Sequence, residues 1–300
     1  AHAMHIAHCQ MMPTMEWCEE YPSHEVDEAM TISCPLMPSM TGCDTYLNGW
    51  DNESPEDVSH LPEALEPRIV ELSDGDVYEI TMSHVRKNIR WTDMAMLAYN
   101  QMIPGPILKV NQGSNITIKA TNDMKNHETT IHWHGLRITP ESDGVPKEMW
   151  GMQDPMHEWD VFEYELTFPD EGMYWYHPHV REDQQQELGL AGNLWVISEN
   201  DDWNPVDREE VLILDDILIE EKKIRSFDDE VTDHALMGRY GNIYLLNGQE
   251  DYKLRVQQNE IIRLYLTNVA NTRTFRFAIP WAKMKRVGSD LGRYERDEWV

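Results

Sequence analysis

The sequence has few cysteines, few basic residues and no long apolar run. Its 300 residues include four cysteines, all between Cys9 and Cys43, so disulfides cannot hold the rest of the chain together. No stretch approaches the roughly 18 consecutive apolar residues of a transmembrane helix, which excludes a membrane span. Only 25 Lys and Arg stand against 54 Asp and Glu, a net charge of −29. This charge excludes nucleic acid as a partner and attracts cations, although a merely solvated surface would look the same.

The chain is long enough for about two domains and shows three zones. Residues 1–65 are rich in Met, Cys, His and acidic residues and show no sustained period, which predicts a loop-rich segment. Short candidate strands then fill residues 66–200 and, after a polar link at 198–205, residues 205–300. Turn dipeptides such as Asn247-Gly248 separate these strands. The pattern predicts an all-β protein with tandem Greek-key sandwich or barrel domains.

The second strand set is shorter than a complete domain. Candidate strands lie at 77–82, 115–120, 162–168, 209–215, 252–256 and 261–266. The alternation is clearest at 162–168, where aromatic and aliphatic side chains take one face and acidic ones the other. The second set has only about 90 residues, whereas sandwiches of this class have about 100. We therefore expect a truncated second domain and a natural protein that continues beyond Val300.

Two His-x-His elements stand out, His132-Trp-His134 and His177-Pro-His179. Chance alone gives about 0.6 such pairs in a chain of this composition, so one pair would mean little. Each pair, however, follows a β-like run, and residues i and i+2 of a strand share a face. Two such strands side by side would direct four imidazoles into one volume.

Four imidazoles are a metal-binding set. Neutral imidazole binds borderline transition metals such as copper and zinc, and a set without thiolate or carboxylate favours copper or a multi-metal site. The alternative is that these histidines are surface or core residues held by hydrogen bonds.

The histidine pairs belong to longer motifs, which are Ala98–Pro106, Ile131–Gly135, Asp143–Pro146 and Gly172–His179. These motifs resemble the first domain of multicopper oxidases, the family that includes laccases and copper-resistance oxidases. Gly238–Gly248 resembles a piece of the second cupredoxin domain of that family. The resemblance covers about residues 66–300 and implies that both strand sets are cupredoxin-like domains.

The resemblance implies a role for each histidine of the two pairs. His132 would bind the type 2 copper of a trinuclear cluster, and His134, His177 and His179 the type 3 pair. Asp143 resembles the acidic residue that supplies protons to the dioxygen being reduced; it also fits a simple Asp-Gly turn. The implied activity couples one-electron oxidation of a phenolic or metal-ion donor to reduction of dioxygen to water. We expect a periplasmic or secreted protein.

The chain also departs from the family pattern. The cluster needs eight histidines, and four are at matching positions. A type 1 copper needs a His-Cys-His motif, which the sequence lacks, so we expect that site in a missing C-terminal cupredoxin domain, either in the same chain or in a partner. Residues 180–186 are more charged than the laccase pattern.

The N-terminal zone contains an internal repeat, in which residues 9–21 align with 34–46 at six of thirteen positions. Its sulfur residues are Cys9, Met12, Met15, Cys18, Cys34, Met37, Met40 and Cys43. Soft thiol and thioether ligands select Cu(I), so one hypothesis is an accessory copper site. The other is a pair of small disulfide loops, from Cys9 to Cys18 and from Cys34 to Cys43, stapling a segment without a core.

Other functions remain open beside the oxidase. An exported copper-binding or sequestration protein would use the same histidines without catalysis, and an inactive fragment would keep the fold alone. A copper nitrite reductase would normally carry a cysteine in its first domain, and none lies within 66–200. A zinc hydrolase would need a carboxylate base beside the metal, for which only Asp143 is a candidate.

Overall fold

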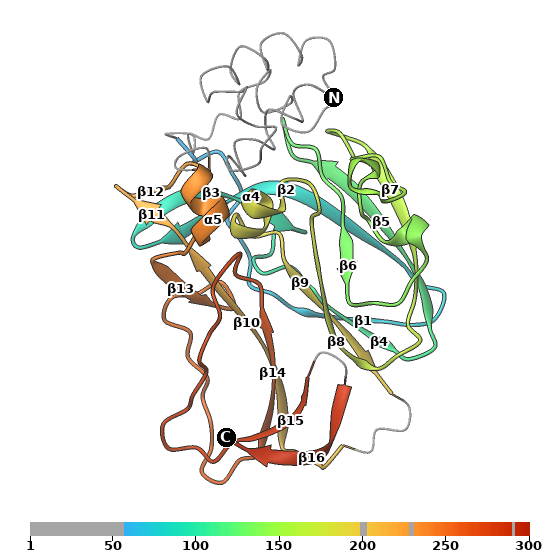
Figure 1. Cartoon of the computed structure of the whole chain (residues 1–300), viewed down its shortest axis with the longest axis vertical. Helices are drawn as coiled ribbons and strands as arrows, with labels where there is room; N and C mark the ends of the chain where they lie inside the picture. Colours follow the sequence, from blue (N-terminus) through green and yellow to red (C-terminus); the bar gives the residue numbers. More distant parts are fainter. Residues whose placement is uncertain (1–56, 199–202, 228–230, 290–291) are drawn as a thin grey trace, which may run out of the picture. The chain divides into compact units, whose positions relative to one another are not determined.

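A computed structural model describes residues 57–198, 203–227, 231–289 and 292–300 (Figure 1). The sulfur-rich repeat at 9–21 and 34–46 lies outside the described residues, so its two hypotheses stay untested. The described chain divides into residues 57–224 with 240–300 and the separate stretch 225–239, and each is treated by itself. In the part of the chain that the structure describes, no helix is long and apolar enough to cross a membrane.

The prediction of an all-β protein is confirmed, with strands throughout and few helical turns. The elements up to residue 197 are β1 (Ile69–Leu72), β2 (Val77–Ile89), β3 (Thr92–Tyr99), β4 (Ile107–Asn111), β5 (Asn115–Asp123), β6 (His132–His134), the 3-10 turns η2 (Pro140–Ser142) and η3 (Lys147–Met149), β7 (Val161–Thr167), β8 (Gly172–His177), the short helix α4 (Glu182–Glu187) and β9 (Gly192–Ile197).

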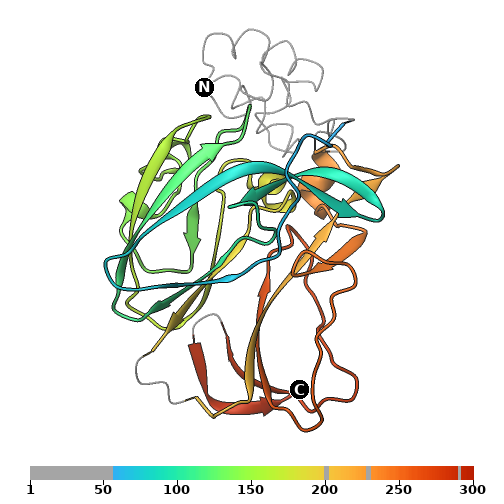
Figure 2. The same ribbon diagram turned by 180° about the vertical axis from the view of Figure 1, so that it is seen from behind.

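These strands form two sheets with a common core. One sheet has the order β3-β2-β5-β7 and the other β1-β4-β9-β8-β6 (Figures 1 and 2). Apolar side chains of both sheets join one buried cluster, which includes Ile80 of β2, Leu108 of β4 and Tyr164 of β7. The alternation predicted at 162–168 is therefore the inward face of β7. β6, with its two histidines, is the last strand of the five-stranded sheet.

The later strands form a smaller set. They are β10 (Arg208–Ile217), β11 (Ile219–Glu220), β12 (Lys223–Ile224), β13 (Ile243–Leu246), β14 (Ile262–Asn268), β15 (Lys285–Ser289) and β16 (Gly292–Trp299). The central sheet has the order β13-β10-β14, and two separate ribbons pair β11 with β12 and β15 with β16. Asn193 of β9 donates a hydrogen bond to Thr267 of β14, with 2.6 Å between Nδ2 and Oγ1, so a buried contact ties the two strand sets together.

One predicted strand is wrong. Residues 252–256 have the alternating pattern of a strand, but the structure assigns none there. The segment forms no ladder with a neighbouring strand; instead the carbonyl of Arg255 accepts a hydrogen bond from the Arg208 guanidinium at 2.8 Å. A period of two shows which side chains share a face, but a strand also needs a partner for its backbone groups.

The separate stretch 225–239 carries the helix α5 (Val231–Met237). The guanidinium of Arg239 donates to the carbonyls of Arg225 and Ser226 and lies 4.1 Å from the centre of the Phe227 ring. These contacts connect the two ends of the stretch 225–239.

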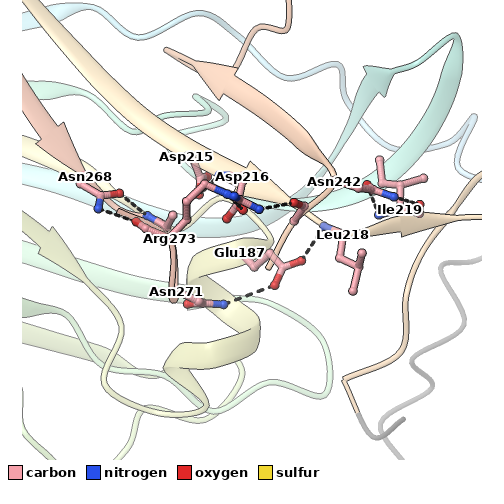
Figure 3. A network of polar contacts seen from close by, with 11 residues as sticks. Glu187, Asp215, Asp216, Leu218, Ile219, Asn242, Asn268, Asn271 and Arg273 are labelled. Atoms are coloured by element: carbon pink, nitrogen blue, oxygen red, sulfur yellow. Dashed lines mark hydrogen bonds and ion pairs between the residues drawn. The ribbon is translucent and has the colours of Figure 1, made fainter. Parts of the chain in front are cut away.

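A polar network connects α4 with residues that adjoin the later strands (Figure 3). Glu187, at the end of α4, accepts a hydrogen bond from the backbone N–H of Leu218 at 2.9 Å and another from the Asn271 amide at 3.3 Å. The Asn271 amide also donates to the carbonyl of Asp183 at 2.5 Å. These bonds fix both turns of α4, the helix that directly follows the second histidine pair.

An ion pair within the same network is almost fully buried on its acidic side. Nε of Arg273 lies 2.6 Å from a carboxylate oxygen of Asp216, whose side chain is 2% exposed. Burial raises the pKa of the neighbouring Asp215 well above its usual range; the hydrogen bond from the backbone N–H of Asp216 opposes this shift, and the negative charge of Glu187 adds to it. Because the Asp216 side chain is almost fully buried, Arg273 is needed to balance the negative charge of its carboxylate.

We expect Arg273→Met to lower the free energy of unfolding by about 3 kcal/mol, because it leaves the Asp216 carboxylate buried without its counter-charge. Chemical denaturation checks this, with the exposed Arg276→Met as the matched control. The double variant Asp216→Asn/Arg273→Met should regain part of the loss. Equal stability of Arg273→Met and the control would contradict the assignment.

Candidate metal centre

Strand β6 places its two histidines on one face because a tryptophan between them occupies the core. Trp133 is fully buried, and its ring meets Tyr164 edge-on with 5.6 Å between centroids. Successive side chains of a strand point to opposite faces. Trp133 therefore turns His132 and His134 away from the core together, as the His-x-His spacing predicted.

Strand β8 repeats the arrangement beside β6. Tyr176 is fully buried, while Trp175 and His177 share the opposite face. The strands are antiparallel, and the register sets His177 opposite His132 and Trp175 opposite His134. The two faces with histidines are therefore continuous across the pair.

Three of the four predicted ligands converge closely. One ring nitrogen each from His132, His134 and His177 lies within 4.8 Å of the others. Nδ1 of His134 and Nε2 of His177 lie 3.3 Å apart. His179 is not in this set of nitrogen atoms, but its ring packs beside the other rings, with its centroid 5.1 Å from that of His132 and 5.9 Å from that of His177.

Backbone carbonyls determine which ring nitrogens are available to a metal. Nδ1 of His132 lies 2.7 Å from the carbonyl oxygen of Asp143, and Nδ1 of His177 lies 2.8 Å from that of Pro178. A carbonyl oxygen can only accept, so both Nδ1 atoms carry the proton. In a neutral ring Nε2 then holds the lone pair. Nε2 of His177, the atom that Nδ1 of His134 approaches, can therefore act as a metal ligand.

Burial keeps the imidazoles of His132 and His177 neutral. Burial, together with the neighbouring His132, lowers the pKa of His177 to about 3. Burial also lowers the pKa of His132, although the hydrogen bond to the carbonyl of Asp143 opposes this shift. Metal ions bind the deprotonated ring, so the site is prepared for a cation near neutral pH.

Asp143 contacts the first histidine through two groups. Besides its carbonyl, its carboxylate oxygen Oδ1 lies 3.4 Å from Nδ1 of His132, and the side chain is 35% exposed. The turn that holds Asp143 is tightly packed: a Cβ on the following Gly144 would lie 1.9 Å from the carbonyl oxygen of Ile131. Asp143 thus combines the predicted turn with a carboxylate that reaches both solvent and the histidine cluster.

Comparison with known proteins shows which family the chain resembles. Residues 80–201 match the family model described as multicopper oxidase. Copper resistance protein A of Escherichia coli is 27% identical over 264 residues, which cover 73% of this chain and 42% of that protein. A multicopper oxidase from Pseudomonas thermotolerans is 26% identical with a TM-score of 0.66, covering 77% of this chain and 56% of its own.

The chain is similar to multicopper oxidases in sequence and in fold, and residues 80–201 match the domain of that family. A laccase-like multicopper oxidase from the bacterium Ochrobactrum sp. is 25% identical with a TM-score of 0.68, and the match covers 80% of this chain and 53% of that one. The chain thus spans about half the length of the multicopper oxidases it matches. The resemblance stated from the sequence motifs is confirmed.

Three neighbours of the histidine cluster were not predicted from the sequence. Trp175 stacks on His177 with 4.1 Å between ring centroids. Thr130 accepts a hydrogen bond from the backbone N–H of His179 at 3.3 Å. Glu182, in the first turn of α4, has Oε2 3.8 Å from Nε2 of His179. Trp175 could have been found, because it precedes His177 by two residues in a strand. Glu182 could not, because its place depends on how the chain turns into α4.

Two histidines without metal-ligand spacing form a separate pair. The rings of His84 and His127 meet edge-on with centroids 5.2 Å apart. Burial, together with nearby His84 and Arg181, lowers the pKa of His127 to about 3. His127 is therefore neutral in the folded chain near neutral pH, whereas an unfolded chain binds a proton there below about pH 6.5.

This difference predicts a pH dependence of stability. Between pH 6.5 and about 3 the unfolded chain holds one more proton at His127 than the folded chain, so the free energy of unfolding falls as pH falls. His127→Phe removes this group, and we expect the slope between pH 6 and 4 to decrease by up to about 1.4 kcal/mol per pH unit. Urea denaturation of the metal-free protein measures it, with the exposed His60→Phe as control. Identical slopes for His127→Phe and the parent would refute the assignment.

Proposed function

We propose that this chain contributes half of the ligands of the trinuclear copper cluster of an oxidase. His132 would hold the type 2 copper, and His134, His177 and His179 the type 3 pair. The observation that carries the proposal is the convergence of three ring nitrogens within 4.8 Å on the faces of two paired strands.

The donor set fits copper. Imidazole nitrogens without thiolates suit copper and zinc, and burial keeps the rings of His132 and His177 deprotonated. Nδ1 of His179 is buried without a hydrogen-bond partner among the described residues, as expected of an atom reserved for a ligand. Copper bound here would supply the electron transfer that reduces dioxygen to water, with electrons from a phenolic or metal-ion donor.

The protein's own residues would orient the ligands and move protons. The carbonyls of Asp143 and Pro178 fix the tautomers of His132 and His177, so that Nε2 faces the cluster. Stacking of Trp175 on His177 restricts rotation of that ring. The Asp143 carboxylate, partly exposed and 3.4 Å from Nδ1 of His132, would pass protons from solvent to the dioxygen side.

The domain assignment belongs to the same proposal. Residues 66–200 would be one cupredoxin domain and 205–300 part of a second. The remaining four histidines and the type 1 copper would come from a further cupredoxin domain, because the sequence holds no His-Cys-His motif.

Copper titration of matched variants tests the proposed cluster. We expect His134→Leu/His177→Leu to bind about one copper per chain less than the parent protein, because two of the converging nitrogens are gone. The control His60→Leu/His157→Leu should bind as much as the parent. Copper held by residues 1–56 cancels in this comparison. Equal copper content in the two double variants would refute the site.

The visible spectrum and dioxygen uptake of the copper-loaded protein separate the half-cluster from its alternatives. We expect bound copper without an intense blue absorption and without dioxygen uptake in the 300-residue chain. A blue band with uptake would mean that this chain holds a complete oxidase site. If uptake does not appear after the remaining cupredoxin domain is supplied, sequestration would replace the oxidase proposal.

A further inference from the structure

A cavity opens between two hairpins that lie far apart in the sequence. The connection from β2 to β3 provides Arg90 and Thr92, and the turn from β11 to β12 provides Lys222. The two hairpins lie side by side (Figures 1 and 2). The cavity has a volume of about 240 Å³, and no acidic side chain is among the described residues that line it. Two cations therefore line one space in a chain whose net charge is −29.

Both cations stand in tight two-residue turns. Arg90 and Trp91 join β2 to β3 with φ of 52° and 64°. Glu221 and Lys222 join β11 to β12 with φ of 48° and 68°. Such left-handed pairs form hairpin turns in which Asn and Gly are the favoured residues. Arginine and lysine do not improve these turns, so their presence indicates a role for their side chains.

Arg90 is held by one carboxylate and keeps most of its donors. Its Nε donates to Oε1 of Glu250 at 2.6 Å, and its backbone N–H donates to Oε2 of Glu250 at 3.1 Å. The guanidinium has five N–H groups, and the four on its terminal nitrogens form no hydrogen bond with another described residue. The exposed Lys222 ammonium likewise has no ion pair among the described residues. Both groups can therefore bind an anion.

The rest of the cavity is mainly apolar. Met94 of β3, Ile219 of β11 and Ile243 of β13 form this part of the lining. Met94 is 2% exposed and Ile243 is 5% exposed, so core packing fixes the wall. Asn242 completes the lining, but its side-chain amide is bonded to the backbone N–H and carbonyl of Ile219, at 3.0 and 2.7 Å (Figure 3). Recognition of a ligand is left to the two cations and the Thr92 hydroxyl.

Charge and size together select one class of ligand. A guanidinium and an ammonium suit an oxyanion, and the planar guanidinium matches a carboxylate in particular. A small inorganic anion would leave the apolar wall uncovered, whereas a cavity of about 150 Å³ already holds benzene. A doubly charged phosphate is disfavoured, because Glu250 already balances part of the charge of Arg90 and the net charge of −29 repels multiply charged anions.

We propose that this cavity binds a small organic monocarboxylate whose apolar body is about the size of one ring. The carboxylate lies between Arg90 and Lys222, and the body of the ligand packs on the three apolar side chains of the wall. None of the four histidines of the proposed cluster lines the cavity. The site is therefore independent of the proposed oxidase activity.

Methyl NMR of the full 300-residue chain, labelled with ¹³C at the methionine methyl groups, tests the site with benzoate as the probe. Met94 lines the cavity, whereas the equally buried Met96, two residues further along β3, does not. We expect benzoate to shift the Met94 signal along a saturable curve and to leave the Met96 signal in place. Benzyl alcohol, which has the ring without the charge, should need at least about a tenfold higher concentration.

Charge variants identify the groups that bind the carboxylate. Lys222→Gln should weaken benzoate binding about threefold, the effect of losing one exposed ion pair. Lys223→Gln is the matched control, because Lys223 is exposed and lies outside the lining; it should bind as the parent does. Arg90→Gln should weaken binding about tenfold, because charge-assisted hydrogen bonds are lost. An unchanged Met96 signal shows that β3 keeps its fold in each variant.

Four results would overturn the proposal. The first is a Met94 signal that benzoate does not shift up to its solubility limit. The second is equal binding by Lys222→Gln and Lys223→Gln, which would reduce the effect to general surface charge. The third is a shift of Met94 by inorganic phosphate at a lower concentration than by benzoate. The fourth is loss of the shift in His134→Leu/His177→Leu, which would move the ligand to the histidine cluster; we expect this variant to bind benzoate as the parent does.

Discussion

The antiparallel pairing of β6 with β8 is the constraint on which the histidine cluster depends. Its register sets His132 opposite His177, and the buried rings of Trp133 and Tyr176 decide which face of each strand turns away from the core. A slip of one residue would exchange the two faces and put the histidines into the apolar interior. Packing of two aromatic side chains therefore positions the nitrogens that a metal would need.

Electrostatics act on the same face. Burial lowers the pKa of both His132 and His177, and carbonyl acceptors hold their Nδ1 protons. The second histidine pair leads directly into α4, whose end Glu187 is tied to Leu218 and Asn271 (Figure 3). Residues that adjoin the later strands thus support the segment that follows His179, although the later strands contribute no histidine to the cluster. Stability of the fold and order of the site are linked through this network.

Much of this arrangement could be predicted from the sequence, because it follows from strand periodicity. The shared faces of His132 and His134, and the inward side of 162–168, require only that alternate residues point the same way. The false strand at 252–256 shows the limit of that reasoning, since periodicity does not reveal whether a partner strand exists. Glu182 beside His179 and the ring contact of His84 with His127 depend on tertiary packing between distant segments. The cavity between Arg90 and Lys222 was likewise hidden, because it forms between two turns that are far apart in the sequence.

Anomalous diffraction at the copper absorption edge, from crystals of the copper-loaded protein, tests the central claim most directly. The account predicts a copper peak within bonding distance of Nε2 of His177 and Nδ1 of His134, with Nε2 of His132 also facing copper. Anomalous copper peaks that all lie away from the nitrogens of His132, His134 and His177 would contradict it.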